Sequence, residues 1–220
     1  VYNMFRSAAG GVTDAVWLLP LLIGMILWAR GQWTAAGLAL GVSCGIKQLP
    51  WAVLPFLLIW TLRTTDGWRA FARRAGRLNA AGFVGFALFT ANIAFIAWRP
   101  TAWWSSVMTP LGAGGPMLIP QGQGLAALAL VNGVRIQPAT WTLLVALVGT
   151  GALIGYWHFF RVRAVRWAAW VLPLAFWVVH SRSLTSYFSS GAVIAVVACA
   201  AGAGVIRGQC GQEVSRSCAE

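Results

Sequence analysis

One lysine stands out among the residues that could carry chemistry. Lys47 is accompanied by fifteen arginines and no other lysine, and it lies in the apolar stretch GLALGVSCGIKQLPWAVLPFLL. Ionisable groups within membrane segments are costly and usually serve a function, so Lys47 is a candidate for holding an anion such as a lipid phosphate. The alternative is a lysine whose ammonium group reaches the membrane interface at little cost. The sequence leaves both interpretations open.

A second group of polar residues is the run His180-Ser181-Arg182-Ser183, followed closely by Tyr187. Arginine pairs with phosphate through two parallel hydrogen bonds, and histidine and hydroxyl groups add further donors. The run therefore favours a phosphate or sugar site, in which His180 and Arg182 bind the phosphate and Tyr187 borders the sugar. The alternative is a short polar loop that only turns the chain.

The segment 99–123 is long, almost uncharged and rich in Trp, Pro and Gly. Trp98, Trp103 and Trp104 fit the aromatic belt at a membrane interface, and they could also stack on sugar rings. Arg99 lies at the start of this segment, on the expected outer side, where basic residues are less common, and it is a candidate to line the cleft for the sugar or its acceptor. Its GAGGP and GQG runs match no phosphate-binding loop pattern.

Acid–base and metal chemistry have little support in this sequence. Asp14 is the one carboxylate expected on the outer side, where it is a weak candidate for a general base and also suits a helix N-cap. There is no Ser/His/Asp set, no HExxH and no paired-cysteine spacing among Cys44, Cys199, Cys210 and Cys218. We therefore expect no metal site and no cofactor.

The composition places the chain in a membrane. Of its 220 residues, 59% are hydrophobic and 9% are charged, and the mean hydropathy is +0.73. Soluble domains carry about 25% charged residues, so this chain lacks the polar groups to cover a globule in water. The net charge of +12 comes from arginines between apolar runs. The positive-inside rule accounts for them, and we expect no nucleic-acid partner.

The apolar runs predict an all-α, polytopic transmembrane helical bundle of six or seven membrane segments. They lie near residues 15–29, 34–46, 50–62, 82–98, 139–160, 166–180 and 187–206, with a re-entrant or interfacial helix at 124–134. Residues 34–62 could be one kinked span or two short helices that turn at Lys47 and Gln48. Two helices place Arg30 on the cytoplasmic side, and Pro50 suits the start of the second.

Two arginine-rich segments set the expected orientation. Residues 63–77 hold five arginines and residues 161–166 hold three, so both are expected in the cytoplasm, the first as a helix on the membrane surface. Residues 99–123 and 180–186 are then outside, and residues 207–220 form a cytoplasmic tail. The first span is not preceded by the charged segment or the cleavage site that are typical of a signal peptide. Val1 could be the product of an unusual start codon or the end of a cut chain.

The stretches GLALGVSCGIKQLPWAVLPFLLIW, NIAFIAWRPTAWWSSVMTPL, PQGQGLAAL and HSRSLTSYF resemble the late portion of bacterial polytopic glycosyltransferases of the GT-C superfamily. The resemblance implies transfer of a sugar from a polyprenyl-phosphate donor to an acceptor at the outer face of the plasma membrane. It implies that Lys47 and Arg182 bind the lipid phosphate, and that Trp103 and Trp104 line the cleft.

Members of that superfamily use an acidic residue of the first outer loop as the base, and no such motif precedes these helices. We therefore expect the chain to be the C-terminal part of a longer enzyme, or to have lost catalytic function. The alternatives are a transporter of small solutes or lipids, for which no internal repeat is visible, and a non-catalytic membrane subunit.

Overall fold

The computed structural model describes residues 16–108, 121–122, 125–134, 137–175, 182–183 and 190–203. Within these ranges the chain is helical, apart from one pair of two-residue strands, β1 (Gln121–Gly122) and β2 (Arg182–Ser183). The predicted all-α class is confirmed. Asp14, His180 and Tyr187 of the predicted sites, and the predicted tail, lie outside the described residues.

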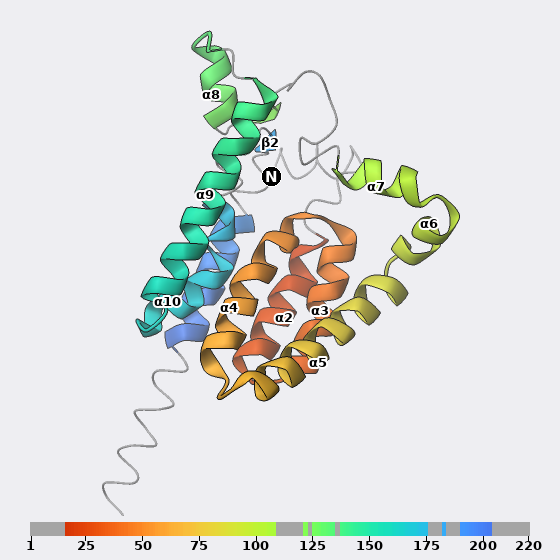
Figure 1. Ribbon diagram of the computed structural model, residues 1–220, viewed down its shortest axis with the longest axis vertical. Helices are drawn as coiled ribbons and strands as arrows, with labels where there is room; N and C mark the ends of the chain where they lie inside the picture. The colour runs from red at the N-terminus through yellow and green to blue at the C-terminus, as the bar shows by residue number, and fades with distance from the viewer. Residues whose placement is uncertain are drawn as a thin grey trace, which may run out of the picture.

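The N-terminal half forms a group of adjacent helices (Figure 1). They are α2 (Leu18–Ala29), α3 (Trp33–Ile46), the 3-10 helix η1 (Leu49–Val53), α4 (Leu54–Thr64) and α5 (Trp68–Leu88). The turns before α3 and α5 each hold a glycine with positive φ, Gly31 (72°) and Gly67 (83°), a backbone conformation that other residues rarely adopt. Residues 34–62 thus contain two helical parts that meet at Lys47 and Gln48, in agreement with the two-helix alternative.

Glycines let α3 and α5 cross with their backbones in contact. A Cβ atom on Gly41 would overlap the carbonyl oxygen of Gly82, and a Cβ atom on Gly85 would overlap the carbonyl oxygen of Leu38. Small residues at four-residue spacing permit such close approach between helices. This crossing fixes the position of α5, and with it the residues that follow α5.

The remaining described helices are α6 (Asn92–Trp98), α7 (Pro100–Met108), α8 (Leu125–Val131), α9 (Pro138–Phe159), α10 (Arg163–Trp167), the 3-10 helix η3 (Ala168–Trp170) and a helix over Ser190–Ala203. In Figure 1, α9 runs along one side of the N-terminal helices and α6 and α7 lie on the other side. Strands β1 and β2 pair in parallel, with Gln121 opposite Arg182.

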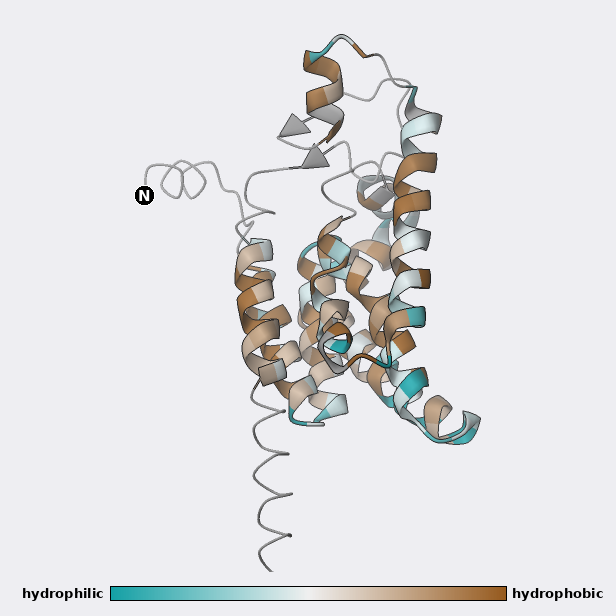
Figure 2. Ribbon diagram, turned by 90° about the vertical axis from the view of Figure 1, so that its left-hand side faces the viewer, coloured by the Kyte–Doolittle hydropathy of each residue, from teal (hydrophilic) through white to brown (hydrophobic). Residues whose placement is uncertain are grey.

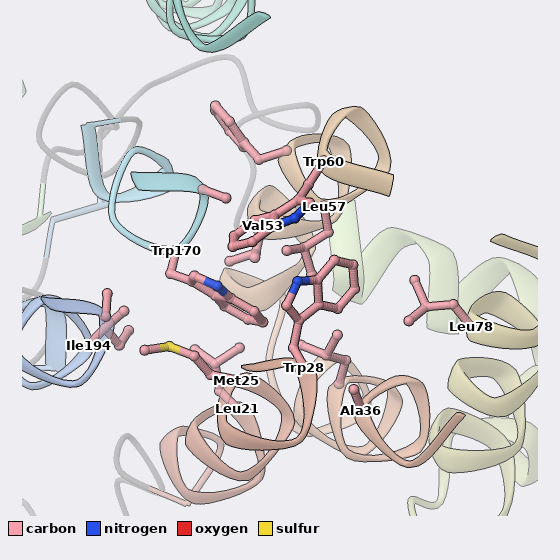
Figure 3. Close-up of a cluster of buried hydrophobic side chains, with 14 of the residues drawn as sticks. Leu21, Met25, Trp28, Ala36, Val53, Leu57, Trp60, Leu78, Trp170 and Ile194 are labelled. Atoms are coloured by element: carbon pink, nitrogen blue, oxygen red, sulfur yellow. The ribbon is translucent and has the colours of Figure 1, made fainter. Parts of the chain in front are cut away.

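Tryptophans form the core between the two halves of the chain. Trp28 of α2 lies edge-on to Trp60 of α4 (ring centroids 5.8 Å apart) and to Trp170 of η3 (6.1 Å). Figure 3 shows these three rings together with Met25 and Ile194. Aromatic pairs in edge-to-face geometry add to the stabilisation from burial. The cluster therefore joins the N-terminal helices to the described residues of 165–175 and 190–203.

The basic turns lie at one end of this arrangement, the lower end in Figure 1. The Arg63 guanidinium lies 4.9 Å from the centre of the Trp157 ring, and the Arg166 guanidinium lies 5.3 Å from that of Phe160. The Arg63 contact joins the end of α4 to α9, and the Arg166 contact joins α10 to the end of α9. Arg63 and Arg166 were both expected on the cytoplasmic side of a membrane, on the grounds of charge alone. In the structure both lie at the same end of α9.

Among the described residues, one helix is long and apolar enough to cross a bilayer, Ala139–Phe159, and there are two if α5 and α6 count as one bent span. A 21-residue helix is about 31 Å long, which matches a hydrocarbon core of about 30 Å, whereas the 12 residues of α2 give about 18 Å. Figure 2 shows the apolar character of the shorter helices as well. The arrangement of six or seven spans stays a prediction.

Two segment boundaries differ from the predicted ones. The basic segment 63–77 and the apolar run 82–98 were expected as separate elements, but α5 continues through residues 78–81, and the bend of 75° comes between Leu88 and Asn92. Residues 78–81 (LNAA) contain neither Pro nor Gly, so nothing interrupts the helix there. Within the predicted outer loop, residues 100–108 form α7, which begins with a proline, a residue suited to the first turn of a helix.

Candidate functional site

Lys47 lies at the break between α3 and η1, between two of the predicted membrane segments. Its backbone is extended (φ −151°, ψ 153°), and its N–H donates to the carbonyl oxygen of Ser43 (3.1 Å). The residue is half-buried, and burial lowers the pKa of its ammonium group to about 8. A cation held there is partly shielded from water, which strengthens its attraction to an anion.

Side chains from later helices bind the carbonyl groups at the end of α3. Trp51 Nε1 donates to the Cys44 oxygen (2.8 Å), and Asn92 Nδ2 donates to the Gly45 oxygen (2.7 Å). The last carbonyls of a helix have no partner within the helix, so such donors stabilise its end. Asn92 therefore fixes the start of α6 against the residues that directly precede Lys47.

Trp103 joins the same hydrogen-bonded group. Its Nε1 donates to Asn92 Oδ1 (2.8 Å), while Asn92 Nδ2 also donates to Thr90 Oγ1 (2.7 Å). We call Gly45, Thr90, Asn92 and Trp103 the Asn92 junction. Through it, α7 is attached to the end of α3, and two of the predicted site residues, Lys47 and Trp103, come to the same part of the molecule.

The other predicted outer residues take no part in the hydrogen bonds of this junction. Trp104 is 56% exposed and Trp98 is 73% exposed, as expected of interfacial rings. The guanidinium of Arg99 lies 5.4 Å from the centre of the Trp98 ring, in cation–π geometry. The backbone of Arg182 is paired with Gln121 of the predicted outer segment 99–123. Two segments that were both expected outside therefore meet.

A cavity of about 220 Å³ lies between α3 and α5 next to the junction. Its walls include Cys44 and Trp51, which flank the break that holds Lys47, and Phe86, whose ring lies 6.3 Å from that of Trp103 in edge-to-face geometry. Most of the remaining lining is apolar or glycine, and Asn79 is polar. Such a cavity suits a hydrocarbon chain better than a polar solute.

Sequence reasoning missed Asn92 because it considered only ionisable groups within the apolar runs. The signal was present: Thr90 and Asn92 interrupt the apolar run GFALFTANIAFIAW. A polar amide within such a run needs partners when it is buried, and this one has three. Trp103 was predicted to lie at the interface or against a sugar, yet its indole N–H is committed to Asn92.

No catalytic acid–base pair or metal site is visible in the described part of the chain. Asp66 is the one carboxylate there, and it lies in the turn between α4 and α5, near the arginine-rich end. No group of three or more His, Cys, Asp or Glu side chains within these ranges could hold a metal ion. What the described residues offer at this place is the half-buried ammonium group of Lys47 and, next to it, a cavity with mostly apolar walls.

The Asn92 junction leads to a stability prediction. Asn92→Leu removes the partner of Trp103 Nε1 and of the Gly45 carbonyl, and each buried group left unpaired costs about 1–3 kcal/mol. We expect a loss of about 2–4 kcal/mol in the free energy of unfolding, measured by denaturant titration in detergent micelles. Asn132→Leu is the matched control. Asn132 is exposed, follows α8 directly and donates its side-chain hydrogen bond to Leu128 of that helix, so the loss on its replacement is expected to stay below about 0.5 kcal/mol. Equal losses in the two variants would contradict the role of the junction.

Comparison with known proteins gives no relative: no family model matches the chain, and no curated protein or solved structure is similar to it.

Proposed function

We propose that this chain is a multi-pass membrane protein that binds a polyprenyl phosphate at Lys47, as the membrane part of a glycosyltransferase. The sugar would pass from the polyprenyl-phosphate donor to an acceptor at the outer face of the plasma membrane. The observation that supports this proposal best is the position of Lys47, at a break between two apolar helices and flanked by residues that line an apolar cavity.

The two parts of a polyprenyl phosphate match the two parts of this site. The phosphate requires a cation, and a half-buried ammonium group attracts it more strongly than one in open water. The isoprenoid chain requires apolar surface, which the cavity between α3 and α5 offers. Arg182 would add a second cation, and Trp104, with its exposed ring, would border the sugar.

The base of such a transfer is not among the described residues near Lys47. Asp14 remains its candidate within this sequence, and otherwise the base would come from another part of a longer protein. Lipid binding can be tested without that base, so it is the part of the proposal to measure first.

Lys47→Ala is expected to weaken the binding of a polyprenyl phosphate to the detergent-solubilised protein by about 10-fold or more, because hydrogen bonds to charged groups contribute about 1.5–3 kcal/mol. Lys47→Arg should retain most of the affinity. Arg69→Ala, at the arginine-rich end, is the matched control for the loss of one positive charge. The corresponding polyprenol, which lacks the phosphate, should bind equally to all variants. Unchanged phosphate binding in a folded Lys47→Ala protein would overturn the proposal.

The pH dependence of binding gives a second test of the same residue. The pKa of Lys47 lies near 8 rather than 10.5, so the ammonium group loses its proton as the pH rises through 8. A phosphate monoester has its second pKa near about 6, so its charge is constant above about pH 7.5. We expect the affinity of the wild type to fall between pH 7.5 and 9 on this basis, and that of Lys47→Arg to stay level. A wild-type affinity that is constant up to pH 9 would contradict a contact with the Lys47 ammonium group.

A lipid transporter is the second candidate, favoured by the bend of 75° between α5 and α6. Transporters use broken helices whose ends point at the substrate, and Thr90 and Asn92 lie at this break. Proteoliposomes with a fluorescent polyprenyl-phosphate analogue distinguish the two functions. A transporter would move the analogue between leaflets, whereas a protein that only binds the donor would leave its distribution unchanged.

A further inference from the structure

A second cavity, of about 590 Å³, lies at the opposite, arginine-rich end of the molecule. It is bordered by the start of α3, including Trp33, Thr34 and Ala35, and by Arg73, Arg74 and Arg77 of α5. No acidic residue is among those that line it, and Asp66 is exposed in the neighbouring turn. Three guanidinium groups and a cavity of this size form a site for an anion that is larger than a simple ion.

The arginines of this cavity differ in what they already bind. Arg74 lies over the Trp33 ring (4.5 Å to its centre) and is 3.5 Å from Thr64 Oγ1, so it is positioned by the protein. Arg73 and Arg77 are exposed, and no hydrogen bond or ion pair joins them to another described residue. Both remain available to a ligand. Arginine binds phosphate through two parallel hydrogen bonds, which makes phosphate the best-matched anion.

The start of α3 adds to the positive potential. No acidic residue lies in its first turn, and no side chain caps it. The amino end of a helix carries a partial positive charge and unpaired N–H groups, which favour a phosphate nearby. The end of a helix and three arginines therefore converge on one cavity.

We propose that this cavity binds the headgroup of an anionic phospholipid. Its position among the arginine-rich turns is that expected for the cytoplasmic membrane surface, where anionic lipids attract basic segments. On the same helix, Trp68 is 72% exposed and lies against Phe71 (ring centroids 5.1 Å apart), an aromatic pair suited to the lipid interface. The site is separate from the polyprenyl-phosphate site proposed at Lys47.

Lipid titration of the solubilised protein, followed by native mass spectrometry, tests this site with phosphatidylglycerol as the probe and phosphatidylcholine as the neutral lipid. Each arginine near an anionic surface contributes about fivefold in affinity, so Arg73→Gln with Arg77→Gln should weaken phosphatidylglycerol binding about 25-fold. Arg69→Gln with Arg161→Gln removes the same charge from residues that do not line the cavity. That control should lose no more than about threefold if binding is local rather than diffuse.

Thr34→Asp separates binding from folding. An acidic residue in the first turn of α3 favours the helix, so the thermal midpoint should hold or rise, while repulsion weakens phosphatidylglycerol binding about fivefold. Equal loss in the cavity pair and the control pair would overturn the proposal, as would unchanged binding in the cavity pair. Displacement of the lipid by millimolar inorganic phosphate would also overturn it, in favour of a soluble phosphate ligand.

Discussion

Gly41→Val is expected to destroy the packing of α3 on α5. A side chain at Gly41 would overlap the backbone of Gly82, which cannot move without displacing α5. Overpacking in a well-packed core costs about 1–3 kcal/mol, and a clash with backbone rather than with a flexible side chain exceeds that range. We expect at least 3 kcal/mol of destabilisation, with aggregation or loss of the purified protein, measured by fluorescence-detected size exclusion and thermal unfolding in detergent.

Gly76→Val is the matched control, because Gly76 lies on α5, the helix that Gly41 packs against, and an added Cβ atom there meets open space. Replacing a glycine inside a helix, where the new side chain has room, leaves the free energy of unfolding unchanged or raises it slightly, by up to about 1 kcal/mol. A Gly41→Val protein that unfolds at the same temperature as the wild type would show that α3 and α5 do not approach each other as described. The glycine spacing in α3 would then need another explanation.

Trp28→Ala has the next largest expected effect. Trp28 is 2% exposed and contacts Trp33, Trp60 and Trp170, so its removal leaves a cavity at the centre of the tryptophan cluster. Truncation of a buried aromatic residue to alanine costs about 3–5 kcal/mol. The free energy of unfolding in detergent should fall by this amount.

The size of the ring rather than its polar group is expected to carry the effect. Trp28 Nε1 is buried and has no hydrogen-bond partner among the described residues. Trp28→Phe breaks no hydrogen bond there and should cost about half as much as Trp28→Ala, or less. Trp98→Ala is the control, since that ring is 73% exposed, with an expected loss below about 1 kcal/mol. Equal losses for Trp28→Ala and Trp98→Ala would contradict the described core.

Local patterns predicted the helical class and the break at Lys47. The length of the apolar runs, the charge of Arg30 and the position of Pro50 each influence only the residues close to them in the chain, so their effect can be predicted from the sequence. The four-residue spacing of Gly37, Gly41 and Gly45 is also visible in the sequence, and such spacing is typical of a close helix contact. The partner helix could not be derived, since it depends on Gly82 and Gly85, forty residues later. The continuation of α5 through residues 78–81 was missed because the change from basic to apolar residues was taken as the boundary of a helix. The backbone hydrogen bonds of a helix do not depend on whether its side chains are basic or apolar.

The candidate site could be predicted only in part, for a similar reason. Lys47 was found because a charge in an apolar stretch is conspicuous in the sequence. The hydrogen bonds from Asn92 to Gly45, and from Trp103 to Asn92, join residues that lie 47 and 11 positions apart. The sequence shows each residue type but not the partner that tertiary packing brings to it. Trp103 was consequently grouped with Trp104, although one ring is hydrogen-bonded and the other is exposed.

The most direct test of the account is the side of the membrane on which each end of the molecule lies. Single cysteines can be placed in a cysteine-free background at Ser106 and Asn132, expected outside, and at Asp66 and Arg161, expected in the cytoplasm; all four are exposed. A membrane-impermeant maleimide should label the first two positions in intact cells and the last two only after permeabilisation. Labelling of all four positions in intact cells, or the reverse pattern, would contradict an arginine-rich cytoplasmic end with the Lys47 site at the outer face.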